Sequence, residues 1–162
     1  KAGTEKFFWM SFCDIYLEIV KDRLYNPDQR GKKQRQSGQY AVSETFLTIL
    51  KLFAPIMPYI TEEIYHMHYA ALEKKKSIHL SSWPVHDSHL VDVKAEEIGD
   101  KLVSIISEVR KAKSAKSLSL KEPVKELTLP FEQKDIAGFL DDLKAVTKAE
   151  KINFGKELKI VL

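Results

Sequence analysis

Residues 7–21 read FFWMSFCDIYLEIVK and lie within the chain's first amphipathic pattern. Apolar side chains recur there at three- and four-residue spacing with charged ones between them, which predicts a helix from about Thr4 to Tyr25. Asn26-Pro27-Asp28 stop this helix. Successive side chains of a helix fan out by about 100°, so three consecutive aromatic rings cannot share one narrow face. One of them, Phe7, is therefore expected to face solvent or a partner, unless a neighbouring helix covers it.

Three further helices follow from the pattern of apolar, capping and basic residues. The second is apolar on two faces, as expected for a helix in the middle of a bundle. The third starts on a capping threonine, Thr61, followed by two acids, and ends on three lysines, while Asp92 can cap the fourth. These helices are expected over residues 40–56, 61–76 and 92–112, with a polar loop up to residue 38 and an extended stretch over 78–84.

The pattern changes after Pro123. Leu127 and Leu129 alternate with polar residues, which predicts a short strand. A helix is expected over residues 135–149, and two more strands over 152–154 and 158–162. The expected fold class is therefore mainly α: a bundle of about four helices in residues 1–122, followed by a small β-α-β-β unit in residues 123–162.

Composition limits the possible classes of protein. The 162 residues are 44% hydrophobic and 30% charged, which is enough for a packed core. Charged residues interrupt the apolar runs, so neither a membrane-spanning helix nor a signal peptide is expected. A single cysteine, Cys13, excludes a disulfide framework and favours a reducing cytoplasm. The six glycines never cluster into a nucleotide-cradling loop.

The residue types that carry out catalysis or bind metals form no recognisable group. His66 and His68 are two residues apart on a predicted helix and point to different faces. His86 and His89 lie in a linker beside acids, where a structural zinc would need further Cys or His ligands. Cys13 lies within an amphipathic helix, where a buried structural thiol is the commoner case. No catalytic residue, metal ligand or cofactor is expected in this chain, and a zinc enzyme built on His86 and His89 stays as an alternative.

Two basic stretches and an exposed ring favour RNA as a partner. Clustered Lys and Arg neutralise phosphates, and an aromatic ring beside a cation suits unstacked bases. The net charge of +3 is mild, so the alternative interpretation of the stretches is an ordinary solvated surface. On charge alone, the residues expected to contact RNA phosphates are Arg30, Lys32, Lys33, Arg110, Lys111 and Lys113.

Three motifs, in order and spacing, give the chain a resemblance to a known family. Residues 7–21 resemble the opening of the anticodon-binding domain of valyl-tRNA synthetases, whose pattern is roughly F-F-W-x-x-F-C-D-x-Y-L-E-x-x-K. Residues 52–65, LFAPIMPYITEEIY, and residues 77–84, SIHLSSWP, resemble two later stretches of that domain. Isoleucyl and leucyl enzymes share the second stretch and the Trp-Pro but lack the Phe-Cys-Asp-x-Tyr-Leu-Glu string.

The resemblance implies part of a class I aminoacyl-tRNA synthetase, which joins valine to its tRNA with ATP and magnesium. The catalytic signatures of that class, His-x-Gly-His and Lys-Met-Ser-Lys-Ser, do not occur in these 162 residues, and neither does an editing domain. The chain is therefore expected to be a noncatalytic C-terminal part of such an enzyme, located in the cytoplasm. Its implied partners are valine tRNA and the rest of the synthetase.

The resemblance also implies which residues of this sequence contact anticodon bases. An anticodon base stacks on a phenylalanine of the basic-Phe-Phe-Trp stretch, which implies Lys6 and Phe7, with Phe8 as second choice. The stretch before the Trp-Pro implies Leu80 and Ser81. Four further motif residues are expected to be structural, with the tryptophan plugging the bundle: Asp14, Tyr16, Glu18 and Trp83.

Family members carry at least one helix before the Phe-Phe-Trp segment, whereas only residues 1–6 precede it here. A bundle without that helix is expected to expose an apolar face that invites self-association. The alternative function is accordingly a helical protein-interaction domain derived from a synthetase, without tRNA reading.

Overall fold

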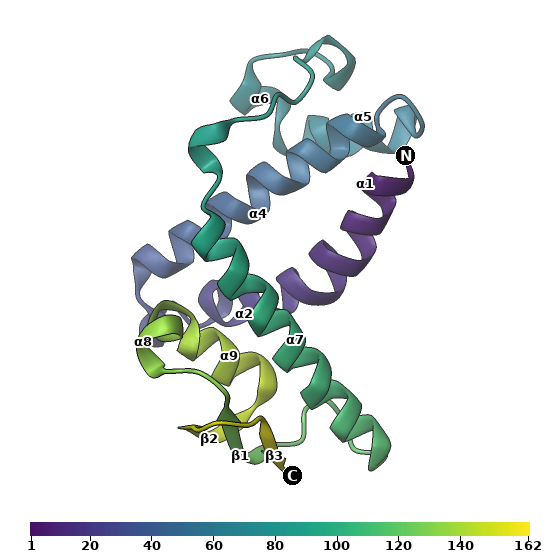
Figure 1. Ribbon diagram of the computed structural model, residues 1–162. Helices are drawn as coiled ribbons and strands as arrows, with labels where there is room; N and C mark the ends of the chain where they lie inside the picture. Colours follow the sequence, from purple (N-terminus) through teal and green to yellow (C-terminus); the bar gives the residue numbers. More distant parts are fainter. The chain divides into compact units, whose positions relative to one another are not determined.

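The computed structural model describes the backbone of residues 1–162 and every side chain except that of Ala137. The chain forms two compact units, Lys1–Ser88 and His89–Leu162 (Figure 1). The first unit is helical, and the second joins a long helix to a small sheet. The expected fold class, mainly α with a small α/β part at the C-terminal end, is confirmed.

The first helical segment runs from residue 2 to residue 25 without a break. It comprises α1 (Ala2–Lys6), η1 (Phe7–Tyr16) and α2 (Leu17–Tyr25), and η1 has the wider turns of a π-helix. The predicted helix and its end before Asn26 are confirmed. Pro27 then opens the short helix α3 (Pro27–Arg30), because the first turn of a helix tolerates a residue without an N–H group.

The next helix, α4 (Lys32–Phe53), begins at Lys32 rather than at Tyr40. The stretch expected to be a polar loop is therefore helical on both sides of Gly31, whose φ of 87° separates α3 from α4. Lys, Gln and Arg are good helix formers, but these turns are exposed and have no apolar pattern to reveal them.

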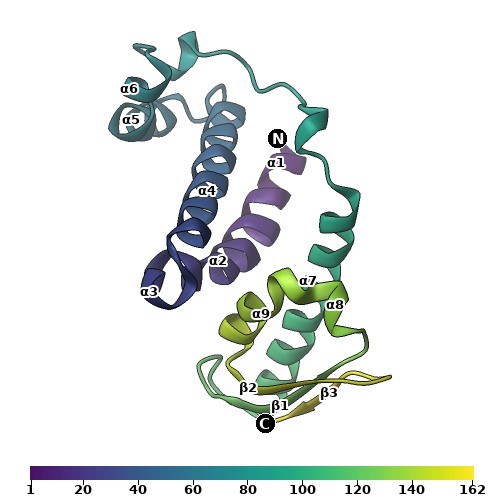
Figure 2. The same ribbon diagram turned by 90° about the vertical axis from the view of Figure 1, so that its left-hand side faces the viewer.

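α4 is the central helix of the first unit (Figure 2). Two clusters of buried side chains involve it, one formed with η1 and the other with α5 (Pro58–His68) and η2 (Ile78–Leu80). The clusters are Phe12, Ile49 and Phe53, and Leu50, Ala54, Tyr65, Tyr69 and Ile78. The prediction of a two-faced helix in the middle of the bundle is confirmed.

Further expectations about this unit are wrong. Thr61 does not cap α5, because the helix begins at Pro58, and the buried Thr61 hydroxyl donates to the carbonyl oxygen of Met57 at 2.9 Å. Trp83 does not plug the bundle, since 59% of its surface is exposed, and Tyr65 is buried inside instead. The stretch expected to be extended starts with the helical turn η2, which follows the short helix α6 (Ala70–Glu73).

The second unit is built on α7 and a sheet. Asp92 caps α7 as predicted, since its carboxylate accepts hydrogen bonds from the N–H groups of Lys94 at 3.0 Å and Ala95 at 3.1 Å. In the sheet, β1 is central, parallel to β2 and antiparallel to β3, which confirms the β-α-β-β order. The elements are η3 (Ser88–Leu90), α7 (Val93–Ala115), β1 (Val124–Leu129), α8 (Gln133–Ile136), η4 (Ala137–Phe139), α9 (Leu140–Thr147), β2 (Ala149–Phe154) and β3 (Lys159–Val161).

α7 groups with the sheet and not with the helical bundle of residues 1–122, where the sequence predicts it. Its buried side chains, which include Leu102, Ile105 and Val109, lie on a helix that packs against α9. The compact units therefore divide after Ser88. The domain boundary at residue 122 stays a prediction.

We expect Gly38→Ala to destabilise the packing of α2 on α4. An added Cβ would lie 2.9 Å from Cγ2 of Val20 and 3.4 Å from Cδ2 of Leu24, and overpacking of this kind costs about 1–3 kcal/mol. Gly99→Ala in α7 is the control, because outside its own helix no described heavy atom lies within 4 Å of the added Cβ. The higher helix propensity of alanine should therefore stabilise the protein by up to about 1 kcal/mol. Thermal and urea unfolding measure both effects, and equal shifts would contradict the close approach at Gly38.

Candidate nucleic-acid interface

Two exposed aromatic rings lie at the start of η1. Phe7 is 46% exposed and Trp9 is 61% exposed. Phe8, between them, turns inward, and its ring centroid lies 6.0 Å from that of Phe53 in an edge arrangement. The prediction that Phe7 faces solvent is confirmed, and Trp9 is a second exposed ring that the sequence analysis missed. Lys6, which ends α1, is exposed next to them.

The second candidate contact lies in the turn of residues 77–81, and a carboxylate of α5 holds its start. Oε2 of Glu62 accepts hydrogen bonds from the Ser77 hydroxyl at 2.9 Å and from the Ile78 N–H at 3.0 Å. Oε1 of the same residue lies 2.9 Å from Nε2 of His66. Glu62, one of the two acids assigned to a helix start, therefore connects α5 to a distant turn.

A second carboxylate holds the end of the turn. Oε2 of Glu73, the last residue of α6, accepts hydrogen bonds from the Ser81 hydroxyl at 2.8 Å and the Tyr65 hydroxyl at 3.0 Å. Lys51 of α4 donates to Oε1 at 2.5 Å. The carboxylate thus joins α4, α5 and the turn at one point. Nothing in the sequence pattern marks Glu73, because its partners come from three separate segments.

Both carboxyls are held in their charged form. Burial raises the pKa of a carboxyl, but at Glu73 the hydrogen bonds from Lys51, Ser81 and Tyr65 outweigh burial and keep the pKa below its ordinary value of 4.5. Hydrogen bonds likewise outweigh burial at Glu62 and lower its pKa. Burial, and then the hydrogen bond to Glu73, raise the pKa of Tyr65 to about 12, so its hydroxyl keeps its proton and remains a donor.

These hydrogen bonds determine which side chains of the turn remain outward. Ile78 is buried, and Ser81 is half-buried with its hydroxyl bonded to Glu73. Leu80 is 66% exposed, and His79 is exposed beside it. Of the two residues predicted to contact a base, Leu80 is open to a ligand, whereas the Ser81 hydroxyl serves as an anchor of the turn.

The aromatic pair and the turn attach to opposite sides of the last turn of α4. Phe53 contacts the ring of Phe8, whereas Lys51 contacts Glu73. Residues two apart on a helix point about 200° apart. Figure 2 shows α1 and α2 on one side of α4, and α5 and α6 on the other. A ligand that touches both sites must therefore pass the end of a helix about 10–12 Å across.

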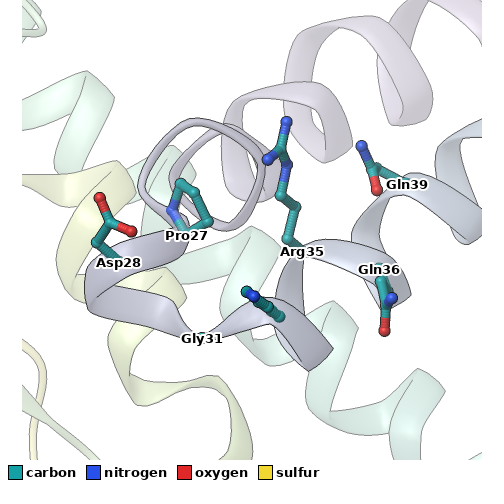
Figure 3. Close-up of a pocket in the computed structure, with 7 residues that line it drawn as sticks. Pro27, Asp28, Gly31, Arg35, Gln36 and Gln39 are labelled. Atoms are coloured by element: carbon teal, nitrogen blue, oxygen red, sulfur yellow. The ribbon is translucent and has the colours of Figure 1, made fainter.

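The corner between α3 and α4 holds a basic hollow (Figure 3). Its lining residues are Pro27, Asp28, Gly31, Lys32, Arg35, Gln36 and Gln39. In Figure 3, Arg35 and Gln39 point to the same side of α4. Lys32 and Lys33 are exposed, as phosphate contacts require. Arg30 is largely buried instead, with its Nε 3.4 Å from Oδ2 of Asp22, so it fits the predicted phosphate contact poorly.

Lys113 is a correction to the predicted phosphate contacts. It is 1% exposed, and its Nζ donates to three carbonyl oxygens, those of Leu120 at 3.0 Å, Glu122 at 2.6 Å and Thr147 at 3.0 Å. Burial lowers the pKa of this ammonium group. The side chain therefore joins the end of α7 to the chain before β1 and to the end of α9, and a phosphate cannot reach it.

The two other basic residues of this stretch lie nearer the surface. Lys111 is exposed, and its Nζ lies 2.8 Å from Oε1 of Glu108. Arg110 is half-buried. Both belong to the second unit, so the basic stretches of the sequence are divided between the two units.

The described side chains that could bind a metal ion do not converge on one site, and the thiol of Cys13 is not activated. Among the described side chains, no three His, Cys, Asp or Glu residues form a group that could hold a metal ion. Cys13 is half-buried, and burial, followed by the charge of Asp14, raises the pKa of its thiol. No helix in the described part of the chain is long and apolar enough to cross a membrane.

Comparison with known proteins gives a consistent set of relatives. A family model described as "Anticodon-binding domain of tRNA ligase" matches residues 2–128, which extends past the division at Ser88 and ends within β1. A valine–tRNA ligase of Wolbachia pipientis wMel is 39% identical over 157 residues, covering 94% of this chain and 17% of the relative. The valine–tRNA ligase of Rickettsia felis is 39% identical over 163 residues, which cover 97% of this chain and 18% of that relative. The chain therefore spans less than a fifth of the length of these curated relatives.

The lowered pKa of Glu73 predicts how stability depends on acid. The unfolded carboxyl takes up a proton near its ordinary pKa of 4.5, whereas the folded one resists protonation, so its stabilising effect is present above that pH and is lost as the pH falls below it. We expect Glu73→Gln to flatten the decrease in unfolding free energy below pH 4.5. Urea unfolding at several pH values measures this, with Glu63→Gln, an exposed acid on α5, as control. The same acid dependence in the wild type and Glu73→Gln would contradict it.

Proposed function

Because this chain belongs to the family of anticodon-binding domains of tRNA ligases, we propose that it reads the anticodon of valine tRNA as part of a valine–tRNA ligase. The exposed ring of Phe7 at the start of η1 supports this most directly. Proteins read RNA mainly where its bases are unstacked, and such bases stack on exposed aromatic rings. Lys6, beside the ring, supplies a positive charge for the adjoining phosphate.

In this proposal, the two sites of the first unit take different nucleotides. Phe7 stacks on one base, with Phe8 as the less exposed second choice, and Leu80 contacts another base beside Ser81. A single nucleotide cannot touch both sites, because the end of α4 lies between them, but a loop with splayed bases can. The exposed lysines Lys32, Lys33 and Lys111 contact the RNA backbone, which is the same at every nucleotide.

The ligation reaction belongs, in this proposal, to the rest of a longer chain. A valine–tRNA ligase uses ATP and magnesium to join valine to its tRNA. We assign the binding of both groups to the part of the ligase that carries the catalytic signatures, which do not occur in these 162 residues. We place the protein in the cytoplasm, where a free thiol such as Cys13 persists.

Exposed apolar side chains favour a second candidate, a helical domain that binds protein. Tyr59, Met67 and Leu72 are exposed on α5 and α6. Exposed apolar side chains such as these suit contact with either the rest of a ligase or a second copy of the chain. Sedimentation that depends on protein concentration would indicate self-association. Binding that distinguishes valine tRNA from the same tRNA with an altered anticodon would support the first candidate.

Phe7→Ala is expected to weaken binding to valine tRNA by about 1–3 kcal/mol, the usual contribution of one stacked base. Tyr40→Ala removes a ring from the middle of α4 that is also exposed, and we expect it to leave the affinity unchanged. Titration of the two variants and the wild type with labelled tRNA measures the effect. If a folded Phe7→Ala variant bound valine tRNA with wild-type affinity, Phe7 would not be part of the RNA interface.

The double substitution Lys32→Ala, Lys33→Ala is expected to weaken binding to all tRNAs alike. Each lost phosphate contact should reduce the slope of log K against log salt by about one. Lys94→Ala with Lys101→Ala changes the net charge equally at two exposed positions of α7 and is the control. A loss of affinity confined to one anticodon, or an equal loss in the control, would contradict a backbone contact at the α3–α4 corner.

A further inference from the structure

We propose that Glu62 and Glu73 are positioning residues for base recognition, which fix the turn of residues 77–81 so that Leu80 reaches its nucleotide. The inference rests on the proposed function, since it concerns how the same site selects a base. Neither carboxylate has to touch RNA for this role.

The start of the turn is fixed on α5. One oxygen of Glu62 accepts both the Ser77 hydroxyl and the Ile78 N–H, at 2.9 and 3.0 Å. Oγ of Ser77 in turn accepts a hydrogen bond from the N–H of His79 at 3.1 Å. The side chain of Ile78 is buried in the cluster between α4 and α5, which gives this end an apolar anchor as well.

The end of the turn is fixed at α6. The Ser81 hydroxyl donates to Glu73 at 2.8 Å, and the same carboxylate is held by Lys51 at 2.5 Å and by Tyr65 at 3.0 Å. The N–H of Ser81 donates to the carbonyl oxygen of Ile78 at 3.1 Å and closes the turn. A short segment with both ends held in this way has little freedom in between.

His79 and Leu80 are the side chains that this arrangement leaves outward. An apolar contact between Leu80 and a base is short-ranged, so a displacement of about 1 Å removes much of it. A turn that is ordered before RNA arrives also avoids the cost of ordering it on binding. Loss of either carboxylate contact is therefore expected to reduce discrimination between bases while the phosphate contacts persist.

The test measures dissociation constants of the 162-residue chain for valine tRNA and for versions with each anticodon base replaced in turn. Ser81→Ala removes the anchor but keeps the Glu73 pair with Lys51, and Glu73→Gln removes the carboxylate itself. Each variant is expected to reduce discrimination by about two- to tenfold, at the position where Leu80→Ala reduces it. Glu63→Gln, an exposed acid next to Glu62, is the matched control and should discriminate like the wild type.

Combining substitutions separates positioning from a merely structural role. If Ser81 acts through Leu80, adding Ser81→Ala to Leu80→Ala reduces discrimination no further. Additive losses, or full discrimination in folded Ser81→Ala and Glu73→Gln variants, would overturn the inference while the proposed function stands. A wild-type chain that binds without discriminating, or does not bind, would overturn the proposed function and the inference with it.

A second readout needs no RNA. The Ile78 N–H donates to Glu62, so Glu62→Ala, which removes the acceptor, is expected to speed hydrogen exchange of this amide in the free chain. Glu63→Ala is the control, because it removes the same charge one residue away. Equal exchange rates at Ile78 in the two variants would show that Glu62 does not hold the start of the turn.

Discussion

Burial of α4 from two sides is the constraint on which the first unit depends. A helix with two apolar faces needs a packing partner for each face, because neither can be left in water at low cost. η1 covers one face, and α5 with η2 covers the other. Phe7 lies on η1, the first of these packing partners, and Leu80 lies on η2, which belongs to the second. The two candidate base contacts are therefore separated by the helix that organises them.

The charged residues divide into those that connect segments and those that face solvent. Glu62, Glu73 and Lys113 each make several hydrogen bonds to groups from distant parts of the chain. Such a group is fixed in place and has little capacity left for a ligand. Lys32 and Lys33 are exposed and can follow a phosphate backbone. A basic stretch in a sequence does not distinguish the two kinds, and for this reason Lys113 was misassigned.

Local sequence patterns predicted those features of the fold that depend on residues close together in the chain. The Asp92 cap, the alternation that gives β1 and the outward ring of Phe7 all depend on residues within one or two turns. Tertiary partners determined the rest. Trp83 is exposed whereas Tyr65 is fully buried, and α4 starts early, in turns that bury almost nothing. In the candidate site, the family resemblance implied Leu80, but nothing in the sequence implied Glu73, whose partners meet only in the folded chain.

Affinity and discrimination make different physical demands on such a domain. Phosphates are alike at every nucleotide, so lysines on a surface add affinity for any RNA. Discrimination is a difference between the free energies of binding two bases, and a mobile contact residue can adapt to either base and reduce that difference. A leucine on a turn that is held at both ends cannot adapt in this way. If Leu80 reads a base as proposed, the hydrogen bonds to Glu62 and Glu73 contribute more to selecting that base than to binding RNA, although they lie beneath the surface that would meet it.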